Sequence, residues 1–450
     1  MNSPSYGATP TKLTQAEQDL LQSDRPGYGT RSRLEVAFNL VNATVGAGII
    51  GLPFAIQNAG FYSGIVLSII VAFLSQLGLH MLVVSGQRTG IYKFAGLVEH
   101  VMGRFGYNFL NIMIVVQAGG ACVSYYILIG DTIPVLFGLY LPDYPLLADR
   151  RFVILLIGVT CVFPLLLSRS IGALARWSIV SVLCLPLIIL TLLVRAPVYA
   201  PQHHAPLTLA GGDIFGALGI MAFAFACSQV AFNNYLSQAD QTERGWAIST
   251  TLATVMSWIT SMAFAIVGYL SFGTAVQPNL FLNFPADDMV VNVGRFALGF
   301  SMILTIPMGF YPTREAVQKM LGFETEDRQP TQVQHYLVTG VLFGLITTLG
   351  VLVQSLGKVY ALIGGFAATT LAYILPATAY LVTRHYPQLA SLEGTIAAKT
   401  PLLHGPSPSP SSSTLEIPIK LTWLDIAAGL LIVWGFMVMV FATAGVFTHP

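Results

Sequence analysis

The chain has 450 residues, of which 54% are hydrophobic and 9% are Asp, Glu, Lys or Arg. Soluble domains carry about 25% charged residues, so this composition excludes an ordinary soluble domain and indicates a polytopic protein of the lipid bilayer. The formal net charge of +1 offers no basic surface, and no nucleic-acid partner is expected.

Charge-free runs divide the chain into eleven predicted transmembrane spans. They lie near residues 33–59, 62–86, 106–136, 152–169, 175–194, 214–238, 246–273, 290–313, 332–353, 358–383 and 421–446. The polar residues 1–32 are expected to form a disordered tail before a transporter domain over residues 33–446, and the Pro/Ser-rich residues 387–419 a disordered loop within it.

With the N-terminus in the cytoplasm, 16 of the 21 Lys and Arg residues lie on the cytoplasmic side. The positive-inside rule therefore predicts a cytoplasmic tail and loop.

The first span contains the strongest local signal. It belongs to a run of 52 residues, Val36 to Gln87, without Asp, Glu, Lys or Arg, yet Gly46, Gly48, Gly51 and Pro53 fall within eight residues of it. Gly weakens a helix and Pro removes a backbone donor. The sequence therefore predicts a helix broken at membrane depth, which is how secondary transporters bind substrates and ions.

The sixth span contains a second, chemically different interruption. Residues 223–238 read FAFACSQVAFNNYLSQ and carry Cys227, Ser228, Asn233 and Asn234 within an apolar segment. Polar residues inside a span usually face protein or water, although the two Asn residues could also mark its cytoplasmic end. The first span opens a group of five and the sixth opens the next five. Corresponding interruptions predict a five-plus-five inverted repeat with a binding site at the repeat interface.

Three motifs resemble the amino acid/auxin permease family. FNLVNATVGAGIIGLP (Phe38 to Pro53) is similar to its first-span signature, FAFAC (Phe223 to Cys227) to its sixth-span core, and LTIPMGFYPTRE (Leu304 to Glu315) to its eighth-span end. The chain resembles fungal vacuolar amino acid transporters and sodium-coupled neutral amino acid transporters. The resemblance implies an all-helical, leucine-transporter-like fold of eleven helices with helices 1 and 6 broken. Many relatives have His after the sixth-span Cys, where this chain has Ser228, which puts the usual coupling chemistry in doubt.

The two interruptions provide candidate substrate contacts. A zwitterionic amino acid needs donors for its carboxylate and acceptors for its ammonium, and the free ends of broken half-helices supply both. We expect the carboxylate at the first break and the ammonium or side chain at the second, with close helix packing as the alternative role for the first-break glycines. The predicted substrate-binding residues are Asn42, Val45, Gly46, Ala47, Gly48, Tyr125, Phe223, Ala226, Cys227 and Ser228.

The resemblance also implies an ion site between the first and eighth spans. Its predicted ligands are Asn42, Val45, Ser301 and Thr305, and oxygen ligands of this kind suit sodium. Alternatively, the Thr305 hydroxyl bonds back to its own helix. For Tyr125, a gating role and simple interhelical packing both remain open.

Proton coupling would instead need a titratable group, and the nearest along the chain are Glu35, His80 and Asp131. For His80, a structural role in a hydrogen bond is the alternative.

These patterns predict a secondary transporter of neutral amino acids, because no charge near the breaks would neutralise an acidic or basic substrate. No enzyme motif, resident cofactor or metal other than a possible sodium ion is expected. By resemblance, the driving force is a proton gradient across the vacuolar membrane. Sodium-coupled symport at the plasma membrane and a non-transporting amino acid receptor are the alternatives. The sequence gives no oligomeric state.

Overall fold

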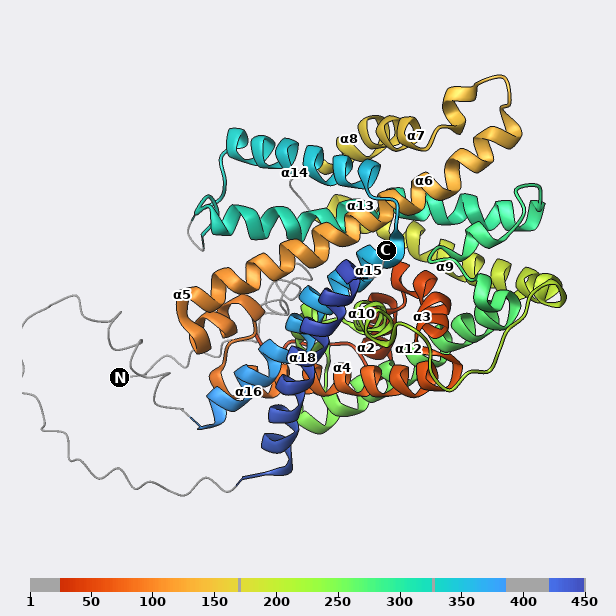
Figure 1. The fold of residues 1–450 in the computed structure, drawn as a ribbon. Helices are drawn as coiled ribbons and strands as arrows, with labels where there is room; N and C mark the ends of the chain where they lie inside the picture. The colour runs from red at the N-terminus through yellow and green to blue at the C-terminus, as the bar shows by residue number, and fades with distance from the viewer. Residues whose placement is uncertain (1–24, 169–170, 326–327, 386–420, 449–450) are drawn as a thin grey trace, which may run out of the picture.

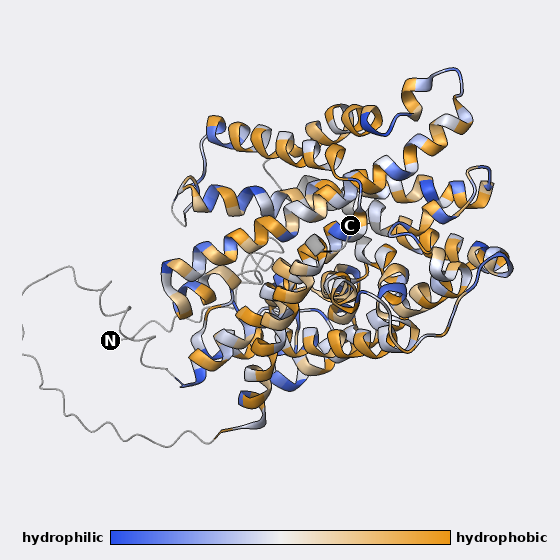
Figure 2. Ribbon diagram, in the orientation of Figure 1, coloured by the Kyte–Doolittle hydropathy of each residue, from blue (hydrophilic) through white to orange (hydrophobic). Residues whose placement is uncertain are grey.

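The computed structural model describes residues 25–168, 171–325, 328–385 and 421–448, so the predicted loop over residues 387–419 and most of the tail lie outside it. The described chain is helical and contains no β-strand. Nine of its helices are long and apolar enough to cross a membrane, or ten if one bent pair is a single span. Figure 2 shows hydrophobic residues along the helices and hydrophilic residues gathered in the connections. The prediction of an all-helical polytopic membrane protein is confirmed.

The bent pair is the predicted first span. α2 (Arg33–Thr44) begins with a capping box between Ser32 and Glu35, followed by η1 (Ala47–Gly51) and α3 (Leu52–Ala59). The two parts are bent by 57°. Pro53 is the second residue of α3. A backbone N–H at this position would have no acceptor within the helix, so proline here costs no hydrogen bond.

The remaining spans follow the predicted order. They are α4 (Phe61–Thr89), α5 (Phe94–Ile114) with η2 (Val115–Gly119) and α6 (Gly120–Tyr140), α9 (Ile171–Tyr199), α10 (Ile214–Phe225) with η6 (Ser228–Val230) and α11 (Ala231–Ser237), α12 (Glu243–Phe272), α13 (Met289–Met320), α14 (Gln332–Leu352), α15 (Leu356–Leu362) with η9 (Ile363–Ala368), η10 (Thr370–Ile374) and α16 (Leu375–His385), and α18 (Trp423–Thr448).

The predicted fourth span is the short one. It consists of α7 (Arg150–Ile157), η4 (Gly158–Val162) and α8 (Phe163–Leu166), which ends at Leu166. A straight helix needs about 20 residues to cross a bilayer, so this element is too short to count as a span on length alone. The difference between eleven predicted spans and the nine or ten observed arises here and at the bent first span.

α10 occupies the centre of one half of the bundle. In Figure 1 it is seen nearly end-on, surrounded by α2, α3, α4, α12, α15 and α18. It packs against α3, α4, α15 and α18, and nine of its residues between 216 and 225 are buried. All nine are Gly, Ala, Ile, Leu, Met or Phe. The second broken span is therefore enclosed by protein along its first half, which allows its irregular end at membrane depth.

The two broken spans are tied together by main-chain hydrogen bonds at both ends. At the end of the bundle where α2 begins, hereafter the N-terminal face, the N–H groups of Thr30 and Arg31 donate to the Ser237 carbonyl (3.0 and 2.9 Å). At the opposite face, the N–H of Gly211 donates to the Ala59 carbonyl (2.7 Å). The start of each broken span is thus joined to the end of the other.

Ion pairs reinforce both faces. At the N-terminal face, Arg33 bonds to Asp240 in the connection after α11, and hydrogen bonds from Thr242 and this guanidinium hold the pKa of Asp240 below its usual value. At the opposite face, Arg195 and Tyr199 of α9 each donate to Asp288, at 2.6 Å. Burial acts to raise the pKa of Asp288, but these two donors outweigh it and keep the pKa below its usual value.

Candidate functional site

The two helix breaks lie against each other. α2 ends at Thr44, and α10 ends at Phe225. A side chain at Gly48 would place its Cβ 2.9 Å from the Cα of Ala224, so only glycine allows the first break to approach α10 this closely. Across the same junction, Thr44 and Cys227 line one small cavity, and the Thr44 hydroxyl donates to the Leu40 carbonyl of its own helix at 2.8 Å. The structure thus brings together the two interruptions that the sequence predicts.

Ser228 supplies an unsatisfied polar group at the second break. Its predecessors Ala226 and Cys227 have non-helical backbone, with ψ angles of 121° and 23°. The Ser228 side chain is 4% exposed, and its buried hydroxyl has no hydrogen-bond partner within the described chain. A buried hydroxyl without a partner costs about 1–3 kcal/mol, so this position is suited to a ligand or a water molecule.

The residue after Ser228 connects the second break to the third span. The side-chain amide of Gln229 donates to the Gln117 carbonyl oxygen at 3.2 Å. Gln117 lies in η2, a π-helical segment, and such segments are frequent at functional sites. Tyr125 lies two turns further along this span, where its ring is 3.9 Å from a Cβ built on Gly309 of α13. The third span therefore contributes a polar group beside the second break and an aromatic ring that packs against α13.

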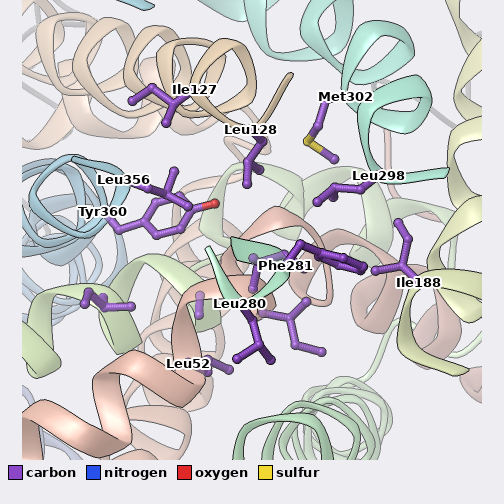
Figure 3. Close-up of a cluster of buried hydrophobic side chains, with 14 of the residues drawn as sticks. Leu52, Ile127, Leu128, Ile188, Leu280, Phe281, Leu298, Met302, Leu356 and Tyr360 are labelled. Atoms are coloured by element: carbon purple, nitrogen blue, oxygen red, sulfur yellow. The ribbon is translucent and has the colours of Figure 1, made fainter. Parts of the chain in front are cut away.

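Two aromatic rings close the side of the site towards the opposite face. Phe223 of α10 and Tyr360 of α15 are stacked, with centroids 4.9 Å apart and planes 22° apart. Tyr360 is fully buried, and its ring lies 2.8 Å from a Cβ built on Gly51. Figure 3 shows Tyr360 beside Leu356 within the buried cluster that also holds Leu52. The sequence predicted Phe223 but not Tyr360, whose only signal was an isolated Tyr in an apolar span.

The predicted first-break residues have different surroundings. Gly46 lies in open space, since a Cβ there would meet nothing within 4 Å, whereas Val45 is 4% exposed and belongs to the hydrophobic core. Asn42 is exposed on α2. Ala47 begins η1, and its side chain lies outside the described part of the structure. Gly46 therefore fits a ligand contact, and Gly48 fits close helix packing.

The predicted ion-site residues of the eighth span bond to the fifth span. The Ser181 hydroxyl of α9 lies 2.8 Å from that of Ser301 and 2.6 Å from that of Thr305. Thr305 also donates to the Ser301 carbonyl at 2.7 Å, so its hydroxyl does bond back to its own helix. Within the described part of the chain, no hydrogen bond joins Asn42 or Val45 to these three hydroxyls. An ion-binding role for the four predicted residues stays a prediction.

The titratable candidates all have structural contacts. His80 lies 3.3 Å from Glu243 at the start of α12, and Glu35 accepts from the Ser32 backbone in the capping box. Asp131 pairs with Arg150 at 3.4 Å and accepts from Asn279 at 3.2 Å. Each of these groups is engaged in holding helices or helix ends together, away from the two breaks.

A model of transmembrane amino acid transporter proteins matches residues 29–396. The chain belongs to this family. The matched range includes both breaks, the stacked ring pair and the three-hydroxyl cluster, and it confirms the resemblance to the amino acid/auxin permeases.

Individual members of the transmembrane amino acid transporter family are similar over most of their length. The chain is 31% identical over 369 residues to a putative sodium-coupled neutral amino acid transporter 11 of Danio rerio, covering 80% of this chain and 82% of the relative. It is 30% identical over 364 residues to vacuolar amino acid transporter 2 of Saccharomyces cerevisiae, covering 77% and 75%. It is 27% identical over 374 residues to sodium-coupled neutral amino acid transporter 7 of Xenopus laevis, covering 78% and 82%.

Family membership confirms three coarse predictions. The chain is a multi-pass membrane protein of an amino acid transporter family, and its relatives are transporters and not enzymes. The relatives include both sodium-coupled and vacuolar transporters, so similarity alone leaves the coupling ion and the membrane undetermined.

Proposed function

We propose that this chain is a secondary active transporter that moves neutral amino acids by alternating access. The observation that carries the proposal is the meeting of two broken helices at Gly48 and Ala224, with an open backbone at Gly46 in the first break and the unsatisfied hydroxyl of Ser228 in the second. Free half-helix ends recognise the charged groups of a zwitterion, and the Phe223–Tyr360 ring pair provides an apolar wall for its side chain. Among the described residues that line the small cavity at the breaks there is no Asp, Glu, Lys, Arg or His, which favours a neutral substrate.

We propose a five-plus-five inverted repeat followed by one further helix, with α7 to α8 as a short fourth span. The hydrogen bonds at the two faces support this topology. Residues Thr30 and Arg31, before the first span, bond to the end of the sixth, and Gly211, before the sixth, bonds to the end of the first. This reciprocal pattern is expected when two spans are related by a two-fold axis in the membrane plane. The charge asymmetry of the sequence supports a cytoplasmic N-terminal face.

For coupling, we propose a proton gradient across a vacuolar membrane, supported by similarity to the yeast vacuolar transporter. Sodium-coupled uptake at the plasma membrane is the second candidate, and a specific observation favours it. The Ser181 hydroxyl lies 2.8 Å from the Ser301 hydroxyl and 2.6 Å from the Thr305 hydroxyl, and grouped neutral oxygens can bind a hard cation. The two candidates differ in which imposed gradient drives uptake.

The test is uptake and counterflow of radiolabelled L-alanine, L-leucine and L-glutamine in proteoliposomes, with pH and sodium gradients imposed separately. Uptake driven by the pH gradient and indifferent to sodium supports the vacuolar proposal. Uptake driven by sodium and lost in Thr305→Ala supports the second candidate. No exchange of any of these amino acids under either gradient refutes neutral amino acid transport and favours the receptor alternative.

A matched pair of serine variants tests the site itself. Ser228→Ala removes the unsatisfied hydroxyl, and we expect about a tenfold rise in KM if that hydroxyl bonds the substrate, equivalent to about 1.4 kcal/mol. Ser271→Ala is the control, because the buried Ser271 hydroxyl bonds the Val267 carbonyl of its own helix at 2.7 Å. Equal KM values for both variants would remove Ser228 from the proposed site.

A further inference from the structure

A second cavity lies at the opposite face, outside the helix breaks. It has a volume of about 610 Å³ and is bounded by the end of α3, the start of α10, the start of α15 and the end of α18. Figure 1 shows the last turns of α18 running beside α15. Small-molecule sites commonly occupy about 300–1,000 Å³, so this cavity is large enough for an amino acid.

The stacked ring pair separates this cavity from the breaks. Along α10, Gly216 and Ile220 line the cavity, Phe223 forms the ring stack with Tyr360, and the break follows at Ala226. Ile220 and Phe223 are three residues apart and so lie on the same side of the helix. A ligand in the cavity would therefore be one helical turn from the ring pair and would not touch the breaks.

The cavity wall presents an acceptor for a positive group. Asp213 lines the cavity, and its Oδ1 atom caps α10 by accepting from the Gly216 N–H at 2.8 Å. Its second carboxylate oxygen accepts no hydrogen bond from the described residues and can therefore accept from an ammonium group. The side-chain nitrogen of Gln57, which also lines the cavity, donates to the Thr274 carbonyl at 2.8 Å, and the Gln57 Oε1 atom is buried away from the cavity space.

The same wall presents a cation and apolar surface. Lys358 of α15 lines the cavity and is exposed, so its ammonium group can bind a carboxylate. Phe54 and Ile220 supply apolar contacts beside it. An acceptor, a cation and apolar side chains in one lining match the three parts of an amino acid with an apolar side chain.

We propose that this cavity is a second binding site for an amino acid zwitterion, held between Asp213 at its ammonium end and Lys358 at its carboxylate end. The choice of ligand rests on the proposed transport function, whereas the geometry of the site does not depend on the helix breaks. Two amino acids can then bind one chain, on either side of the Phe223–Tyr360 ring pair.

The test is equilibrium dialysis of the purified full-length protein in detergent with radiolabelled L-alanine. Wild type is expected to bind two molecules per chain. Lys358→Gln and Asp213→Asn are each expected to lose one, while Ser228→Ala weakens the remaining site. Asn retains the helix cap of Asp213, and Lys358→Arg retains the charge and is expected to restore binding of two. Size-exclusion profiles identify any variant that fails to fold.

The outcomes separate this inference from the proposed function. One molecule per chain in wild type, unchanged in Lys358→Gln and weakened in Ser228→Ala, overturns the second site and leaves transport at the breaks intact. Two molecules per chain in both wild type and Lys358→Gln also overturns it. Loss of one site in Lys358→Gln with no exchange in proteoliposomes supports the second site and refutes transport.

Discussion

Two neighbouring glycines in the first break allow packing and ligand contact to be measured separately. A Cβ at residue 48 would lie 2.9 Å from the Cα of Ala224, whereas a Cβ at residue 46 would meet nothing within 4 Å. Carbon atoms prefer separations of about 3.5–4.0 Å. Gly48→Ala therefore forces a backbone displacement of about 0.6–1.1 Å, and Gly46→Ala forces none.

Overpacking of this size costs about 1–3 kcal/mol. We expect Gly48→Ala to lower the melting temperature of the purified protein by a few degrees and to reduce uptake, because it separates the two breaks. Gly46→Ala is the matched variant: its melting temperature should equal that of wild type, and its uptake should fall through a higher KM because the methyl group enters the proposed site.

The measurements are thermal unfolding in detergent and initial uptake rates in proteoliposomes for both variants. The reasoning is refuted if Gly48→Ala melts at the wild-type temperature, because the close approach to α10 would then be absent. It is also refuted if Gly46→Ala destabilises the protein as much as Gly48→Ala, because the space beside residue 46 would then be filled.

Three further predictions concern contacts away from the breaks. Asp288→Asn should destabilise the protein by about 1–3 kcal/mol at pH 7. Because the folded pKa of Asp288 is lowered, its contribution is present above the unfolded value and is lost as pH falls through the folded value. The difference between wild type and variant in thermal unfolding should therefore begin to shrink as pH falls below about 4. A disulfide between Arg31→Cys and Gln238→Cys, which pair in a β-bridge, should leave uptake unchanged on oxidation in a background that keeps Cys227 and replaces the other three native cysteines. Tyr360→Ala should lower uptake by removing the ring stacked on Phe223, while Tyr360→Phe should preserve it.

Each of these predictions has a contrary result. A constant stability difference from pH 7 to pH 3 would mean that the Asp288 charge is not the source of stability. Uptake lost on oxidation of the cysteine pair and restored by reduction would mean that the two spans separate during transport. Loss of uptake in Tyr360→Phe would assign the function to the hydroxyl and not to the ring.

The breaks could be predicted from sequence because their causes are local. Glycines and a proline in a charge-free run weaken a helix wherever they occur, and the irregular backbone at Val45 and Gly46 lies within a residue or two of the predicted position. The second break at Ala226 and Cys227 was likewise marked by polar residues in an apolar span.

The partners of the predicted residues could not be predicted, because they depend on packing between distant spans. Nothing near Tyr360 in sequence indicates that it stacks on Phe223, and nothing near Ser181 indicates that it meets Thr305. The length of the fourth span was overestimated for a different reason. The charge-free run continues to Ser168, past the last helical residue Leu166, so counting uncharged residues places the end of the span too late.

The hydrogen bonds that join the two broken spans at both faces give them the mechanics of a closed frame. Their outer corners, at Arg31 with Ser237 and at Ala59 with Gly211, are fixed by main-chain atoms. Such a frame changes shape by rotation at its inner joints, which are the two breaks. A substrate bound at the two breaks would therefore lie where a change of a few backbone angles moves whole half-helices at the membrane surfaces.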